Sequence, residues 1–263
     1  MATYLYCLLT PPRAEDFPRE LTGIAGIAVR PLVAAGRAGR AALEAWVATI
    51  DDPLLRTADG ARTATFALAH NEVVEAAMAT GRTPLPARFG QRFLDDAGCR
   101  ADLAQRAATI RRALARVAGC VEMGVVIAQS APRVDSDLER TPITVPGRHE
   151  PQAGRRYLEA LRSRARDEEA RSAVWESALA AVSASVRRLV RAEAKHRTPR
   201  GPWSISHLVP REAVDAYRAT IESMETQSSA RLVLSGPRAP YSFSDEGLEP
   251  LGGHDSGSLS NND

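Results

Sequence analysis

The chain has 263 residues and a formal net charge of only +2, with 44% hydrophobic and 25% charged residues. Its length favours two domains of roughly 100–150 residues each. The composition is that of an ordinary globular protein, which excludes a wholly disordered or collagen-like chain. The sequence has no uninterrupted apolar run of about 18 residues, so we expect no membrane-spanning helix. A near-neutral charge gives no general reason to expect a nucleic-acid or membrane partner.

The amino-terminal residues and the cysteines indicate the cellular compartment. The stretch before Pro11 and Pro12 lacks the basic start and the apolar core of a secretory signal. The cysteines, Cys7, Cys99 and Cys120, are widely spaced and odd in number, which is typical of reduced thiols rather than of a disulfide framework. We therefore expect a soluble intracellular protein.

The first half of the chain predicts a small sheet with helices. In chain order, the predicted elements are strands at 3–9 and 24–34, helices at 39–50 and 62–79, an extended segment at 84–93 and a helix at 102–117. The first strand is an apolar, β-prone run that stops at Pro11. The helices are predicted where apolar residues recur at intervals of three and four. The 39–50 helix depends on one such set, Leu43, Trp46, Val47 and Ile50.

The second half of the chain alternates in the same way. Its predicted elements are a strand at 121–127, a long helical region at 157–197, a strand at 203–209, a helix from 210 to 224 and a strand at 231–234. Residues 130–151 combine several prolines with polar residues and predict a loop. The residues after Phe243 are acidic and rich in glycine and serine, which predicts a disordered tail.

This order of elements predicts an α+β fold with two units, each a small sheet packed with helices on one face. We place the boundary near Gly119, where the long predicted helix of the first half has ended. The division gives an amino-terminal domain at 1–118, a carboxyl-terminal domain at 119–244 and the acidic tail at 245–263.

Motifs for catalysis or metal binding are nearly absent. The sequence has no Gly-x-Gly-x-x-Gly, phosphate-loop or His-Glu-x-x-His motif, and its five histidines are scattered. We predict no catalytic, cofactor-binding or metal-ligating residue. Two alternatives stay open: a small-molecule enzyme that uses His70 and Glu72, and a nucleic-acid binder, because all but Lys195 of the 34 basic residues are arginine. Acidic residues interleaved along the arginine-rich helical region favour a solvated, ion-paired surface instead.

Three clusters of residues each have a functional and a structural interpretation. In the 70–75 cluster, His70, Asn71 and Glu72 adjoin an apolar pair and either serve a partner or acid/base site or satisfy backbone groups beside the sheet. The two prolines of the 84–90 cluster suit either an edge segment that meets a partner strand or a rigid connection. The 235–243 cluster is a constrained turn that either locks the last strand to the core or displays its two aromatic residues.

These clusters are part of a longer series of short motifs, which match one protein family in their order and spacing. The series is Tyr4-Leu5-Tyr6, His70-Asn71-Glu72-Val73-Val74-Glu75, Leu85-Pro86 with Arg88-Phe89-Gly90, Val121-Glu122 with Gly124-Val125, Gly154 with Tyr157-Leu158, the 206–209 strand before Tyr217, Leu234 to Gly236-Pro237, and Pro240-Tyr241-Ser242-Phe243. In this order and spacing, over about residues 3–243, the chain resembles the GvpF/GvpL family of gas vesicle proteins.

The resemblance implies a cytoplasmic, vesicle-associated protein that is not an enzyme, has no cofactor and carries a ferredoxin-like carboxyl-terminal domain. It implies a minor structural component and assembly factor that binds the hydrophobic shell protein GvpA and limits its aggregation during nucleation. Other gas vesicle accessory proteins are further expected partners, whereas nucleic acid and membranes are not. The predicted contact residues are Pro84, Leu85, Pro86, Arg88, Phe89, Tyr241 and Phe243, together with His70, Asn71 and Glu72.

Overall fold

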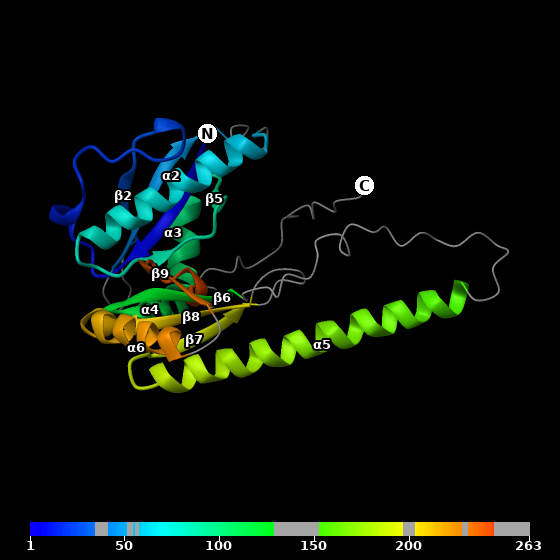
Figure 1. The fold of residues 1–263 in the computed structure, drawn as a ribbon. Helices are drawn as coiled ribbons and strands as arrows, with labels where there is room; N and C mark the ends of the chain where they lie inside the picture. Colours follow the sequence, from blue (N-terminus) through cyan, green and yellow to red (C-terminus); the bar gives the residue numbers. More distant parts are fainter. Residues whose placement is uncertain are drawn as a thin grey trace. The chain divides into compact units, whose positions relative to one another are not determined.

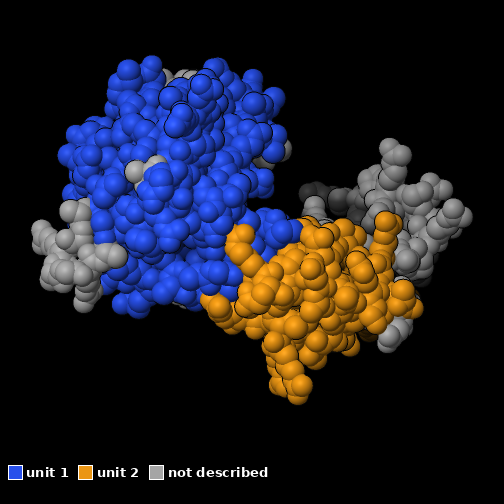
Figure 2. Space-filling view, turned by 90° about the vertical axis from the view of Figure 1, so that its left-hand side faces the viewer, with its two compact units in different colours: residues 1–122, 237–263 blue, residues 123–236 orange. Residues whose placement is uncertain are grey.

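The computed structural model describes residues 1–34, 42–51, 55, 58–128, 153–196, 203–227 and 231–244. The chain divides into two compact units, unit 1 with residues 1–122 and 237–263 and unit 2 with residues 123–236 (Figure 2). The fold is α+β, as predicted, with two small antiparallel sheets packed with helices (Figure 1). Both the proline-rich 130–151 stretch and the 245–263 tail lie outside the described residues.

Unit 1 is built on a five-stranded sheet. Its strands and helices are β1 (Ala2–Leu9), β2 (Arg30–Ala34), β3 (Leu43–Ile50), α2 (Gly60–Ala79), β4 (Leu85–Pro86), β5 (Arg92–Phe93), α3 (Asp96–Gln105) and α4 (Ala107–Val117), with short 3-10 helices at Ala14–Asp16, Ile24–Gly26 and Tyr241–Phe243. The strand order is β2-β3-β1-β4, and β5 also pairs with β1. Strand β1 is therefore central, which explains why all eight of its residues are buried.

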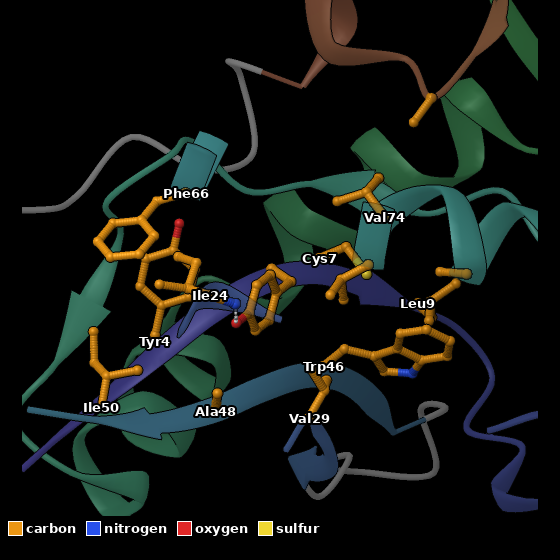
Figure 3. Packing of buried hydrophobic residues seen from close by; sticks show 14 of the residues in the cluster. Tyr4, Cys7, Leu9, Ile24, Val29, Trp46, Ala48, Ile50, Phe66 and Val74 are labelled. Atoms are coloured by element: carbon orange, nitrogen blue, oxygen red, sulfur yellow. Dashed lines mark hydrogen bonds between the residues drawn. The ribbon is translucent and has the colours of Figure 1, made fainter. Parts of the chain in front are cut away.

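Helix α2 packs on one face of this sheet and forms the main core of unit 1. Its buried residues, among them Phe66, Val73 and Val74, contact a cluster that includes Tyr4 and Trp46 (Figure 3). A bulge in β1 between Leu5 and Cys7 shifts the register against β3, so that consecutive residues Tyr6 and Cys7 both join this cluster. The Asp59 side chain caps helix α2 by accepting a hydrogen bond from the Arg62 backbone N–H. The helix predicted at 62–79 is confirmed.

Helix α3 covers the other face of the sheet, where the Thr3 hydroxyl donates a hydrogen bond to Asp96 at 2.7 Å. Helices therefore lie on both faces, and not on one face as predicted. The single helix predicted at 102–117 is two helices, α3 and α4, separated at Arg106. Arg106 turns the chain there while its guanidinium pairs with Asp102. The apolar residues of both helices still follow the predicted spacing, because both bury one side.

The helix predicted at 39–50 is wrong, because residues 43–50 form strand β3. This strand pairs with β1 on one side and β2 on the other, and seven of its eight residues are buried. A strand that is buried on both faces has apolar residues at nearly every position, so helical spacing appears by coincidence. Trp46 and Val47 illustrate this, since both are fully buried although consecutive strand residues point to opposite faces.

Unit 2 contains a four-stranded sheet in the order β7-β8-β6-β9. Its elements are β6 (Cys120–Ala128), which begins in unit 1, α5 (Ala153–Val186), β7 (Ala192–His196), β8 (Ser204–Pro210), a 3-10 turn (Arg211–Ala213), α6 (Val214–Gln227) and β9 (Arg231–Arg238), which ends in unit 1. This is the β-α-β-β-α-β order of elements that ferredoxin-like domains share. Among the described side chains of α5, full burial is confined to its last turns, at Leu179, Val182 and Val186. The amino-terminal part of α5 extends past the sheet (Figure 1).

The helical region predicted at 157–197 is only partly correct, because its last residues form strand β7. Residues 192–196 pair with β8, with Ala194 opposite Ser206. Their sequence, Ala-Glu-Ala-Lys-His, has good helix formers, so tertiary pairing overrides local propensity here. Strand β9 likewise continues past the predicted stop at Gly236 and Pro237 to Arg238. Within the described ranges, no helix is long and apolar enough to cross a membrane.

A buried ion pair ties three parts of unit 1 together. Glu44 on β3 is almost fully buried and accepts hydrogen bonds from the Trp46 indole at 2.7 Å and the Arg13 backbone N–H at 2.8 Å. Its counter-ion is the Arg82 guanidinium, which lies 3.3 Å from Glu44 Oε2 and also donates a hydrogen bond to the Pro11 carbonyl. The carboxylate thus connects the sheet, the loop after β1 and the end of α2.

We expect Glu44→Gln to lower the free energy of unfolding by about 3 kcal/mol, because it leaves the charge of Arg82 buried without its counter-ion. Urea denaturation followed by circular dichroism measures the change. The exposed Glu20→Gln is the matched control and should stay within about 0.5 kcal/mol of the wild type. A loss for Glu44→Gln that is no larger than the control would show that the pair contributes little.

Candidate partner-binding segments

His70 lies in the middle of α2 with both ring nitrogens hydrogen-bonded. Nδ1 is 2.8 Å from the Tyr4 hydroxyl, and Nε2 is 3.2 Å from the carbonyl oxygen of Ala87. A carbonyl oxygen can only accept, so Nε2 carries the proton and Nδ1 accepts from Tyr4. Burial lowers the pKa of His70 to about 4, which keeps the ring neutral at pH 7. The imidazole therefore connects helix α2, strand β1 and the chain at residue 87.

The 84–90 segment is fixed to the sheet through its backbone. Leu85 and Pro86 pair with Leu8 and Cys7 of β1, and the Ala87 N–H donates to the Tyr6 carbonyl at 2.8 Å. The Gly90 N–H donates to the Tyr4 hydroxyl at 3.1 Å, and Gly90 has a positive φ of 88° that favours glycine. The segment is thus anchored at both ends of its length.

Some of the predicted contact residues of this anchored segment are buried, and others are exposed. Pro84, Leu85 and Pro86 are buried, whereas Arg88 and Phe89 are exposed, with 39% of Phe89 accessible. The Phe89 ring stands edge-on to His70, with ring centroids 6.0 Å apart. The arginine and the aromatic ring therefore reach solvent from a backbone that the sheet and His70 hold in place.

The outer side of α2 carries the other polar residues that the sequence singled out. Asn71 is half-buried and donates to Glu75 at 2.9 Å, and Glu72 is exposed. Leu68, one turn before Glu72 on the same side of the helix, is 67% exposed. Leu68 is not among the predicted contact residues, because an apolar residue in a helical pattern normally lies in the core.

The carboxyl-terminal turn is held by a second buried carboxylate. Glu122 is fully buried and accepts from the Arg238 guanidinium at 2.7 Å and from both the backbone N–H and the hydroxyl of Ser242 at 2.8 Å. The Arg116 guanidinium donates to the Phe243 carbonyl at 2.6 Å. Phe243 is buried and Tyr241 is half-buried, and burial raises the pKa of the Tyr241 phenol. This turn belongs to unit 1, and its two aromatic side chains face inward.

The geometry also bears on an acid/base role for His70 and Glu72. Both ring nitrogens of His70 are engaged by Tyr4 and Ala87, so neither is available to exchange a proton with a ligand or with Glu72. Among the residues that the structure describes, no three histidine, cysteine or acidic side chains are grouped as metal ligands would be. In this structure His70 connects α2, β1 and residue 87, and its ring nitrogens are not paired with Glu72.

Because folded His70 has a low pKa, we expect the free energy of unfolding of unit 1 to fall in acid. An unfolded histidine binds a proton near pH 6.5 and folded His70 only near pH 4, so the unfolded state binds more protons between these values and stability falls as the pH decreases. The loss is on the order of 3 kcal/mol across this window. Urea denaturation of the wild type and His70→Gln at pH 7 and pH 4 measures it.

His207→Gln tests the same effect in unit 2, because His207 is a second buried histidine whose pKa is lowered to about 4, and this variant should likewise lose less stability than the wild type on acidification. The wild type should lose more stability than His70→Gln on acidification. Equal losses in the wild type and in His70→Gln would contradict the assigned neutral ring.

The chain is similar to proteins of a known family. The family model of gas vesicle synthesis protein GvpL/GvpF matches residues 2–245. The crystal structure of the gas vesicle protein GvpF from Anabaena sp. PCC7120 is similar at 19% identity and a TM-score of 0.65, and that of GvpF from Microcystis aeruginosa at 16% and 0.64; each match covers 92% of this chain and 98% of the other. No curated protein sequence matches. The family match spans nearly the whole chain, and the chain therefore belongs to the GvpL/GvpF family of gas vesicle synthesis proteins.

Proposed function

We propose that this protein is a cytoplasmic assembly factor and minor vesicle component that binds the hydrophobic shell protein GvpA during vesicle nucleation. Family membership supports a role in gas vesicle synthesis. A shell subunit with a dry face exposes a large apolar patch and unpaired strand edges before it assembles, and both are aggregation hazards. A folded partner that covers them keeps the subunit available for assembly, and other gas vesicle accessory proteins then meet the same complex.

The observation that carries this proposal is the exposure of Arg88 and Phe89 on an anchored segment. Arginine and aromatic side chains dominate the binding energy of many protein interfaces. An aromatic ring combines a large contact area with few rotatable bonds, and a guanidinium supplies several hydrogen-bond donors. The backbone from Ala87 to Gly90 is already hydrogen-bonded to β1, so binding has little segment ordering to overcome. Phe89 supplies the apolar contact, and Arg88 supplies the polar rim.

Glu72 and Leu68 are exposed on the outer side of α2, opposite the side on which His70 holds the 84–90 segment, so they belong to a separate exposed surface. The buried members of the predicted set, His70, Pro84, Leu85 and Pro86, act in this proposal by positioning Arg88 and Phe89. Tyr241 and Phe243 take no direct part, since their side chains face inward in unit 1.

The double variant Arg88→Ser/Phe89→Ser should bind GvpA at least about tenfold more weakly than the wild type, because it removes both proposed contacts. Co-expression with GvpA, followed by pull-down and measurement of the soluble fraction of GvpA, checks the effect. Circular dichroism verifies that the variant is folded, which is expected because both side chains are exposed.

A matched control replaces an exposed arginine and an exposed apolar residue elsewhere in unit 1, in Arg19→Ser/Val33→Thr. This variant should retain GvpA at the wild-type level. If the folded Arg88→Ser/Phe89→Ser variant retains as much soluble GvpA as the control, the 84–90 segment is not the contact site. If the wild type itself neither binds GvpA nor raises its solubility, the proposed function is wrong.

A further inference from the structure

Unit 1 contains a cavity of about 310 Å³ that is separate from the 84–90 tip. Three arginines, Arg13, Arg82 and Arg111, and two threonines, Thr10 and Thr83, line it together with small residues and Leu114. Its lining, as far as the described residues form it, includes no carboxylate. Arg82 is paired with the buried Glu44 and Arg13 with Asp16, so the three guanidinium groups give this concave site a positive but partly balanced potential.

The fold brings these residues together from three separate places in the sequence. Thr10 and Arg13 come from the loop after β1, Arg82 and Thr83 from the chain just after α2, and Arg111 from α4. Gly81 and Gly119, each two residues beyond the end of α2 or α4, line the cavity, and their φ angles of 81° and 70° favour glycine and turn the chain away from the helix axis. Close approach of the loop and the two helix ends leaves the cavity between them.

Part of the lining is rigid. The Arg82 side chain is only 7% exposed, and its guanidinium is positioned by the buried Glu44 and by the Pro11 carbonyl. The hydroxyls of Thr83 and Thr10 donate to the carbonyls of Cys120 at 3.3 Å and Ala42 at 3.4 Å. A ligand that contacts this wall therefore meets groups that are already ordered, and it loses little affinity to the ordering of side chains.

The outer part of the lining is more accessible. The Arg13 side chain is 53% exposed and makes a long, 3.8 Å ion pair with Asp16, of the exposed kind that contributes little energy. Arg111 is half-buried on α4. These two arginines come from different elements, the loop after β1 and helix α4, and line the cavity together with the fixed Arg82.

We propose that this cavity binds a small oxyanion, with phosphate or carboxylate groups as the chemistry that is recognised. The planar guanidinium donates paired N–H groups to such oxygens, which makes arginine the preferred residue for them. The cavity lies at the lower end of the roughly 300–1,000 Å³ range of small-molecule sites, which limits the ligand to a small molecule. Arginines near helix carboxyl termini also interact favourably with the helix dipole, and that purely structural role is the alternative that the experiment must separate.

Isothermal titration calorimetry of the full chain with inorganic phosphate and with citrate tests the proposal, using sodium chloride at matched ionic strength as the reference. One of the two oxyanions should bind with a stoichiometry near one, and the stronger ligand identifies phosphate or carboxylate as the source of the recognised group. Arg111→Gln and Arg13→Gln should each weaken binding by about tenfold or more, because each removes a charged hydrogen-bond donor. Arg112→Gln, one residue further along α4 at an exposed position outside the lining, should bind like the wild type.

Circular dichroism without ligand shows whether Arg111→Gln is folded, and Arg13→Gln decides the question if it is not, since half of the Arg13 side chain is exposed. Absence of binding by both oxyanions would overturn the proposal. So would an Arg112→Gln defect equal to that of Arg111→Gln, which indicates a diffuse surface effect, or a loss of stability in Arg111→Gln with unchanged binding, which indicates the structural role. The titration contains no GvpA, so its result is independent of the proposed function.

Discussion

The hydroxyl groups of Tyr4 and Tyr6 must find hydrogen-bond partners inside the core of unit 1, and this requirement fixes much of its arrangement. Both side chains lie on the fully buried strand β1. An unpaired hydroxyl there would cost more than the net gain of an ordinary hydrogen bond. Tyr4 joins His70 and the Gly90 N–H, while Tyr6 accepts from the Ile24 N–H at 3.0 Å. A Cβ at Gly23 would stand 2.2 Å from the Tyr6 hydroxyl, so that loop can approach only with glycine.

Two buried carboxylates, Glu44 and Glu122, also need hydrogen-bond donors inside unit 1. Glu44 accepts from a side chain of its own strand, from the loop after β1 and from Arg82, and Glu122 holds the returning carboxyl-terminal turn through Arg238 and Ser242. Each carboxylate is satisfied only if segments that are distant in sequence are all in place. Such networks contribute less to net stability than to selecting one arrangement of the chain. In this unit they hold the loop after β1, the chain after α2 and the carboxyl-terminal turn in place.

The sequence predicts those elements whose local pattern agrees with their burial. Strand β1 and helix α2 are of this kind, whereas β3 and β7 are not: β3 is buried on both faces and mimics a helical period, and β7 is a helix-prone sequence recruited by pairing with β8. The candidate segments were selected because family motifs mark them, and their role as contact sites stays a prediction. Whether His70 or Phe89 reaches solvent depends on long-range partners such as Tyr4, and no local pattern contains that information.

The cavity and the 84–90 segment are adjacent parts of one stretch of chain. Arg82 and Thr83 line the cavity, and Pro84 follows them directly. Helix α2 holds the segment through His70, and Gly81, two residues beyond the end of this helix, lies in the cavity lining. An oxyanion bound to Arg82 would add a restraint at the start of the segment, next to the restraints that β1 and His70 already supply. Ligand binding that favours the folded arrangement stabilises every element that must be ordered with it. Oxyanion binding in the cavity, as proposed above, would therefore also restrain the start of the segment that carries Arg88 and Phe89.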